Sequence, residues 1–194
     1  DVKKLKKPKN ILGGKGANLA EMGRLGLPVP PGFTISTEVC HLFYENKKKL
    51  NIKLIKEINK ELKQIEKDSK KKFGDLKNPL LVSVRSGARV SMPGMMDTIL
   101  NLGLNDQTVI ALAKKTSNPR FAKDSYRRFI QMYSNVVLGV ETYRFEELIE
   151  NYKLTKGVLL DTDLDESDWD NLINDFKNLV SPWMVILLLY VTSI

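Results

Sequence analysis

Apolar residues recur every three or four positions in several stretches of the chain, and this spacing predicts amphipathic helices. The first helix is expected to follow a glycine cluster at 13–16 and to stop at Gly26. A second begins after Thr37, which can act as its cap, and breaks near 47–51, and a third runs on from Ile52. The apolar face of this third helix comprises Ile55, Ile58, Leu62 and Ile65. Its other faces hold the lysines.

Three more helices are predicted in the second half of the chain. They are expected over 108–115, over about 124–137, and around Ser167 and Asp170, whose spacing resembles a capping box. The apolar run Trp183–Val191 follows Pro182 and differs from the patterned residues before it. It is too short to cross a bilayer, which takes about 20 residues, so we expect no membrane association.

Prolines and β-branched residues mark the extended segments. Residues 27–36 are expected to be extended, because a proline pushes the residue before it out of the helical region, with a short strand at 33–35. The run LLVSV at 80–84 predicts a buried strand, and glycines and a proline predict a loop over 87–94. The chain therefore predicts an α+β fold: a small sheet with helices, then a helical portion from about 107.

The 194 residues carry a formal charge of +8, which is concentrated in two segments. Residues 1–10 carry a net +4 and residues 45–77 a net +6, so the remainder is slightly acidic. Both segments use lysine without arginine and have few aromatic residues, so the groups that read bases are missing. We therefore expect a solvated lysine-rich face and no nucleic-acid partner.

Cys40 is the single cysteine, so no disulfide can form within the chain. Residues 1–10 lack the apolar stretch of a secretory signal. Both features favour a cytoplasmic protein.

The glycine cluster Gly13-Gly14-Lys15-Gly16 opens a helix and suits a phosphate group. Glycines let a ligand approach the backbone, a helix start favours an anion, and Lys15 adds positive charge. The pattern departs from a P-loop because Gly16 follows Lys15. The alternative is that the cluster is only a turn.

Arginines are concentrated in a second stretch, which begins at the end of the predicted strand. The chain has 24 Lys and seven Arg, and five of the seven arginines lie between 85 and 128: Arg85, Arg89, Arg120, Arg127 and Arg128. Planar guanidinium groups can grip phosphate or carboxylate oxygens with two hydrogen bonds. The alternative is that they pair with nearby acids such as Asp97 and Asp124.

A third stretch, 91–98, holds a Pro-Gly turn with three methionines, which could form an apolar wall for a base or simply fill a core.

Two other patterns of residues give weaker evidence for a functional site. Cys40 and His41 are adjacent, so they cannot face each other on a helix as nucleophile and base. Asp161, Asp163 and Asp165 resemble the start of a calcium loop, but the glycine and the final acid of that loop are missing.

Residues 13–37, 80–106 and 120–140 together resemble the N-terminal nucleotide-binding domain of the pyruvate, phosphate dikinase family. The segment SGAR…SMPGMMDTILNLG favours the dikinases over the related phosphoenolpyruvate synthases. The resemblance implies the first lobe of an ATP-grasp domain over 1–106 with a lysine-rich insert at 45–77. A helical subdomain at 107–180 and an atypical tail at 181–194 would follow.

The resemblance also implies ATP as substrate, with Mg²⁺, in the conversion of ATP, phosphate and pyruvate to AMP, pyrophosphate and phosphoenolpyruvate. Partners would be a phosphohistidine domain, a pyruvate-binding barrel and a second copy in a homodimer. By similarity the ATP contacts would be Lys15, Arg85 and Arg128, with Met95 and Thr98 beside them. No catalytic residue or metal ligand is expected within the chain.

The apolar end departs from the family after Leu179. We expect it to be a frame-shifted or otherwise altered end of a truncated product that is inactive alone. The alternative function is a non-catalytic nucleotide- or phosphate-binding module, and a third is a basic nucleic-acid-associated protein.

Overall fold

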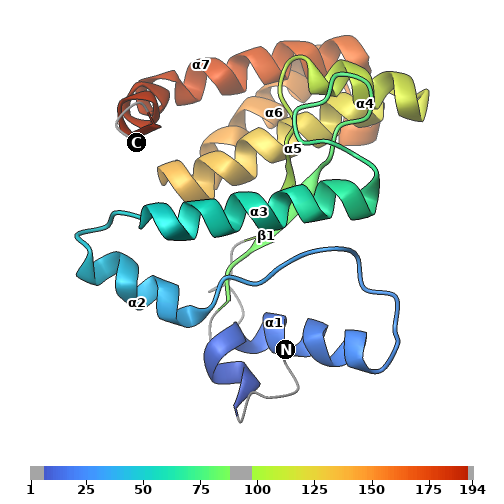
Figure 1. Ribbon diagram of the computed structural model, residues 1–194. Helices are drawn as coiled ribbons and strands as arrows, with labels where there is room; N and C mark the ends of the chain where they lie inside the picture. Colours follow the sequence, from blue (N-terminus) through green and yellow to red (C-terminus); the bar gives the residue numbers. More distant parts are fainter. Residues whose placement is uncertain (1–6, 88–97, 192–194) are drawn as a thin grey trace. The chain divides into compact units, whose positions relative to one another are not determined.

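The computed structural model describes residues 7–87 and 98–191, with side chains up to Pro182 (Figure 1). The chain divides into two compact units. Unit 1 comprises 1–71 and 85–97, and unit 2 comprises 72–84 and 98–194. The sequence-based domain boundaries at 106/107 and 180/181 remain predictions.

The described residues of unit 1 form three helices: α1 (Pro8–Arg24), α2 (Thr37–Glu45) and α3 (Ile52–Ser69). The predicted breaks at Gly26 and at 47–51 are confirmed, and α3 begins at Ile52 as expected. Its cap is Asn51, whose side chain accepts a hydrogen bond from the Lys53 backbone N–H at 2.8 Å. This bond satisfies one of the free donors of the first turn.

The sequence-based picture of the first helix and of the segment after it needs three corrections. Helix α1 begins at Pro8, ahead of the glycine cluster, and consists of two helical stretches that meet at a kink at Gly13, so the predicted helix is the second stretch and an additional helical turn precedes it. Residues 27–36 form neither helix nor strand, with a bend at Pro31, and 33–35 pairs with no strand in the described part of the chain. Ser36 occupies the N-cap position of α2 without a capping hydrogen bond from its side chain, and Thr37 is the first residue of the helix.

Unit 2 holds a two-stranded antiparallel sheet and four α-helices within the described residues. The elements in chain order are β1 (Val82–Arg85, whose last residue belongs to unit 1), β2 (Thr98–Leu102), α4 (Thr108–Thr116), α5 (Pro119–Leu138), α6 (Thr142–Lys156), the 3₁₀ turn η2 (Asp161–Asp163) and α7 (Glu166–Val191). The α+β class is thus confirmed.

Helix α5 is the centre of unit 2 and packs against α4, α6, α7 and β2. The apolar core lies around it, and the rings of Phe145 and Phe176 meet edge to face with centroids 4.8 Å apart. Trp169 is fully buried in the same cluster. Helix α5 begins at Pro119, five residues before the predicted start, because the Asn118 side chain caps it.

The sequence analysis contained no helix at 142–156, where α6 lies. The strand at 80–84 is displaced to 82–85, and its residues are half-buried or exposed rather than buried. Helix α7 continues through Pro182 to Val191, so the apolar run extends an existing helix. No helix in the described part of the chain is both long and apolar enough to cross a membrane.

Candidate nucleotide-phosphate site

The glycine cluster and the loop after β1 meet through their backbones within unit 1. Gly13 has φ +69° and ψ 174°, and a β-carbon added to it would lie 2.6 Å from the carbonyl oxygen of Gly87. Such an approach is closer than a side chain tolerates. The structure therefore brings together two of the stretches that sequence reasoning had singled out separately for a phosphate.

A third segment packs onto the same cluster. A β-carbon added to Gly16 would lie 2.9 Å from the Thr34 Cγ2 atom, and the Thr37 hydroxyl donates a hydrogen bond to the Asn10 carbonyl oxygen at 2.6 Å. Gly13 and Gly16 are both buried as a result. The sequence analysis treated 27–37 only as a connecting segment and did not predict this contact. The available signal was weak: small residues such as threonine can pack closely against glycines.

Two cationic side chains flank the meeting of Gly13 and Gly87. Lys15 follows Gly13 by two residues and is half-buried, and Arg85 precedes Gly87 by two residues and is exposed. Two residues of chain span at most about 7 Å, so both side chains start close to the glycine contact. Within the described residues neither side chain has a hydrogen bond or an ion pair. No neighbour among the described residues therefore neutralises either cation.

Arg128 belongs to unit 2, where it contacts an acid of its own helix. Its Nη2 atom lies 3.1 Å from the Asp124 Oδ2 atom, while more than half of its side chain remains exposed. Arg127 also binds Asp124, at 2.6 Å, and stacks over the Trp169 ring. For these two arginines the structure shows the alternative interpretation, in which they pair with a nearby acid, Asp124.

Arg120 also has a structural role, since it donates hydrogen bonds of 2.6 Å to the backbone carbonyls of Leu164 and Asp161. Thr98 is the first residue of β2 and is half-buried. Met95 lies outside the described residues, as do Arg89 and Asp97.

One cluster of contacts in unit 2 shifts the pKa values of two titratable groups, Asp106 and Tyr126. Asp106 accepts hydrogen bonds from Lys177 and from the Tyr126 hydroxyl, and Lys177 in particular lowers the pKa of the Asp106 carboxyl. Burial, together with the neighbouring Asp106 charge, raises the pKa of Tyr126 well above its ordinary value. This cluster joins α5 to α7 and gives no sign of a reaction centre.

The acids that resemble a calcium loop are engaged elsewhere. Asp161 pairs with Lys153, at 3.1 Å, and Asp165 caps α7. In the described part of the chain no three His, Cys, Asp or Glu side chains gather closely enough to hold a metal ion. The Mg²⁺ implied by the resemblance therefore finds no donor set among these residues.

The comparisons with known proteins bear on this site directly. The family model described as "Pyruvate phosphate dikinase, AMP/ATP-binding domain" matches residues 9–71 and 47–140, more than half of the chain. The chain belongs to this family. The matched residues include Lys15, Gly87 and both arginines, Arg85 and Arg128.

Several pyruvate, phosphate dikinases are similar to the chain over most of its length. The enzyme of Clostridium symbiosum is 57% identical over 169 residues, that of Entamoeba histolytica 55% over 168, and the chloroplastic enzyme of Mesembryanthemum crystallinum 56% over 170. These matches cover 87–88% of the chain but 18–19% of each relative. The chain thus spans about a fifth of the length of these dikinases.

Proposed function

We propose that this chain is the ATP-binding part of a pyruvate, phosphate dikinase, and that Lys15 and Arg85 hold ATP phosphates beside Gly13 and Gly87. The observation that carries the proposal is the backbone approach of these two glycines, with two cations beside it that are unpaired within the described residues. Membership of an AMP/ATP-binding family supports a nucleotide as the ligand.

The backbone around Gly13 suits an anion. The kink at Gly13 restarts the helix at Gly14, and the N–H groups and dipole of a first turn favour negative charge. Since Gly13 carries no side chain, the Gly87 backbone can lie directly against it, and this contact brings the stretches that hold Lys15 and Arg85 together beside that first turn.

The two cations would contribute in different ways. Arg85 offers a planar fork for two oxygens of one phosphate, while Lys15 offers a mobile point charge. Phosphoryl transfer spreads negative charge over the transferred group, so positioned cations stabilise its transition state without forming a bond to it. Arg128, Met95 and Thr98 remain further proposed ATP contacts, which rest on the family resemblance alone.

The reaction proposed for the whole protein converts ATP, phosphate and pyruvate to AMP, pyrophosphate and phosphoenolpyruvate through a phosphohistidine. The phosphohistidine domain, the pyruvate-binding barrel, a homodimer and a cytoplasmic location belong to the same proposal. Mg²⁺ would neutralise phosphate charge in that reaction, and its ligands would come from elsewhere, because the described residues offer no cluster of ligands.

Calorimetric titration of the purified chain with ATP tests the assignment of Arg85. Hydrogen bonds to charged groups contribute roughly 1.5–3 kcal/mol, so R85A should weaken ATP binding by more than about tenfold, and K15A should also weaken it. The matched control is R24A, because Arg24 also lies in unit 1 but pairs with Glu21 at 2.5 Å.

An ATP affinity in R85A equal to that of the unchanged chain would refute the phosphate site. Since the chain is expected to be inactive alone, the alternative of a non-catalytic nucleotide-binding module would be favoured if the chain bound ATP but, joined to the remaining domains of a dikinase, still transferred no phosphate to the histidine.

A further inference from the structure

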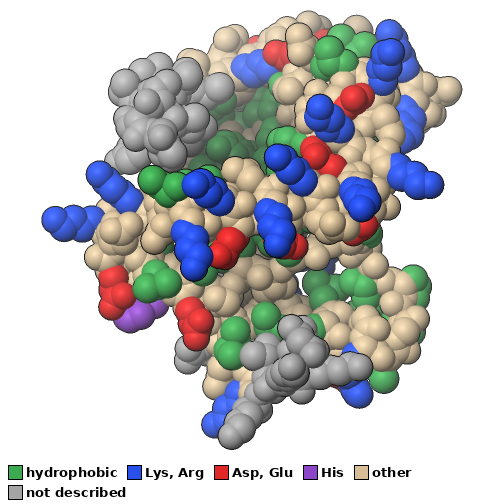
Figure 2. Space-filling model, viewed as in Figure 1, with side chains coloured by type: hydrophobic (Ala, Val, Ile, Leu, Met, Phe, Trp, Pro, Cys, Tyr) green, Lys and Arg blue, Asp and Glu red, His purple; other side chains and the backbone are tan. Residues whose placement is uncertain are grey.

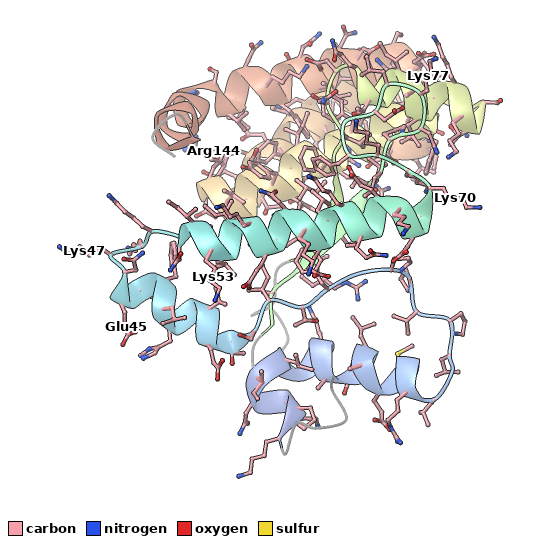
Figure 3. All side chains as sticks on the ribbon, in the orientation of Figure 1. Glu45, Lys47, Lys53, Lys70, Lys77 and Arg144 are labelled. Atoms are coloured by element: carbon pink, nitrogen blue, oxygen red, sulfur yellow. The ribbon has the colours of Figure 1, made fainter. Side chains whose placement is uncertain are left out.

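Helix α3 carries a row of lysines along one face. The row consists of Lys53, Lys56, Lys60, Lys63, Lys67 and Lys70. Their spacings of three and four residues follow the helical repeat, so the five lysines within α3 lie on one side of the helix, and Lys70 follows directly as its C-terminal cap residue in the left-handed conformation. At 1.5 Å per residue the helical part of the row, Lys53 to Lys67, is about 21 Å long. Figure 2 shows basic side chains gathered along α3, and Figure 3 labels the two ends of the row, Lys53 and Lys70.

These ammonium groups are exposed, and most of them lack a counter-charge. All six lysines are exposed, and no ion pair joins Lys53, Lys56, Lys60, Lys63 or Lys67 to an acid within the described residues. The acids Glu57, Glu61 and Asp68 lie on a neighbouring face of the same helix. Like charges at this spacing repel one another, so the row destabilises an isolated helix slightly. A contact with an anionic surface would offset that repulsion.

The composition of the row limits what that surface can be. After Ile52, the apolar residues of α3 lie on another face, where they are half-buried or buried: Leu54, Ile55, Ile58, Leu62 and Ile65. A stable protein interface has an apolar centre and is depleted in lysine, which the row does not match. It also lacks the arginines and aromatic rings that read nucleic-acid bases.

The straightness of the row favours a flat partner. A straight line of charges meets the wound backbone of a duplex only where the two cross, whereas every lysine of the row can reach a plane at once. Lysine clusters on one face of an amphipathic helix are typical of binding to anionic lipids. We propose that the lysine row of α3 adsorbs the protein to a membrane surface rich in anionic lipid headgroups, reversibly and without insertion.

Co-sedimentation with vesicles of phosphatidylcholine, with and without phosphatidylserine, tests the proposal. The chain should bind the anionic vesicles only, and should release them between about 0.1 M and about 1 M salt, where the screening length falls from about 10 Å to about 3 Å. Each lysine near an anionic surface contributes roughly fivefold to binding. The variant K56Q/K60Q/K63Q should therefore bind at least tenfold more weakly.

The matched control is K9Q/K77Q/K114Q, which removes the same charge from exposed lysines outside the row. It should bind within about threefold of the unchanged chain, because the effect belongs to the row rather than to net charge. Glutamine is a good helix former, and circular dichroism confirms that both variants keep their helices.

Three results would overturn the proposal. The first is an equal loss of binding in the two variants, and the second is no preference for anionic vesicles. The third is tighter, row-dependent binding to a short DNA duplex than to vesicles, which would assign the row to nucleic acid. None of these results depends on the ATP site, so the two proposals fail separately.

Discussion

Gly13 occupies a backbone conformation that is almost restricted to glycine. With φ +69° and ψ 174° it lies in a region that costs other residues about 1–3 kcal/mol. The position is constrained a second time, because the Gly87 carbonyl fills the space where a β-carbon would lie. A single residue therefore fixes both the kink in α1 and the approach of the loop after β1.

The variant G13A should accordingly lose more stability than a change of backbone conformation alone explains. Gly26 is the matched control, since it has φ +75° but no atom within 4 Å of an added β-carbon. We expect G26A to cost about 1–2 kcal/mol and G13A at least about 1 kcal/mol more, as measured by urea denaturation. G13A should also weaken ATP binding. Equal losses of stability in the two variants would contradict the close contact with Gly87.

At the scale of elements, caps decide where helices begin. The side chain of Asp165 accepts hydrogen bonds from the Ser167 N–H at 2.8 Å and the Asp168 N–H at 3.1 Å, and Asp168 accepts one from the Asp165 N–H at 2.7 Å. The reciprocal cap of α7 is thus Asp165 with Asp168, and the pair expected from the sequence, Ser167 with Asp170, is wrong. Two overlapping polar pairs were present, and only geometry distinguishes them.

The Asp165 cap makes α7 sensitive to acid. Hydrogen bonds from the Ser167 hydroxyl, the Asp168 N–H and Lys156 hold the pKa of Asp165 well below its ordinary value. The charged form is favoured when folded, so its stabilisation is present above the ordinary pKa of about 4 and is lost as pH falls through the lowered value.

The variant D165N keeps an oxygen acceptor but cannot be protonated in this way. Its melting temperature should fall less steeply than that of the unchanged chain between about pH 5 and pH 2. The control D175N alters an exposed carboxylate of the same helix that has no ion pair within the described residues. Parallel pH profiles for D165N and the unchanged chain would refute the role of this cap.

Local patterns predicted the elements whose signals are local. Helix α3 was predicted from regular spacing and α4 from a similar run, and the start of each is confirmed. Helix α6 was missed because Lys153 interrupts its buried face while Tyr143 and Leu154 are exposed, so its spacing is irregular. Gly157, in the left-handed conformation after its end, was the remaining signal for this helix.

The candidate site also shows that local sequence patterns predict only local features. Lys15 and Arg85 were chosen from composition and resemblance, but the contact of Gly13 with Gly87 joins residues 74 positions apart. No local pattern specifies such a pairing.

At the scale of the whole molecule, the buried apolar side chains are distributed unequally between the two units. Among the described residues, the buried apolar side chains of unit 1 are Ala17 and Ile65, and the others lie in unit 2. The core around α5 and α7 includes Trp169, Phe145 and Phe176, all fully buried. Local stability follows the density of buried apolar contacts, so the two units should differ.

Hydrogen exchange should reveal this difference. We expect amides in the middle of α5 and of the first half of α7 to exchange at least tenfold more slowly than those of α2 and α3. Mass spectrometry of peptides from the exchanged chain provides the measurement. Similar rates in the helices of both units would contradict the unequal burial.

Unit 1 is assembled from two separate stretches of chain, with residues 72–84 of unit 2 between them. No single cut of the polypeptide can therefore release either unit whole. Each unit depends on both of its stretches of chain, so neither corresponds to one continuous segment of the polypeptide. On a ribosome, α1 to α3 emerge before the Arg85–Gly87 stretch that contacts them, so the glycine contact can form only after the first strand of the other unit has been synthesised.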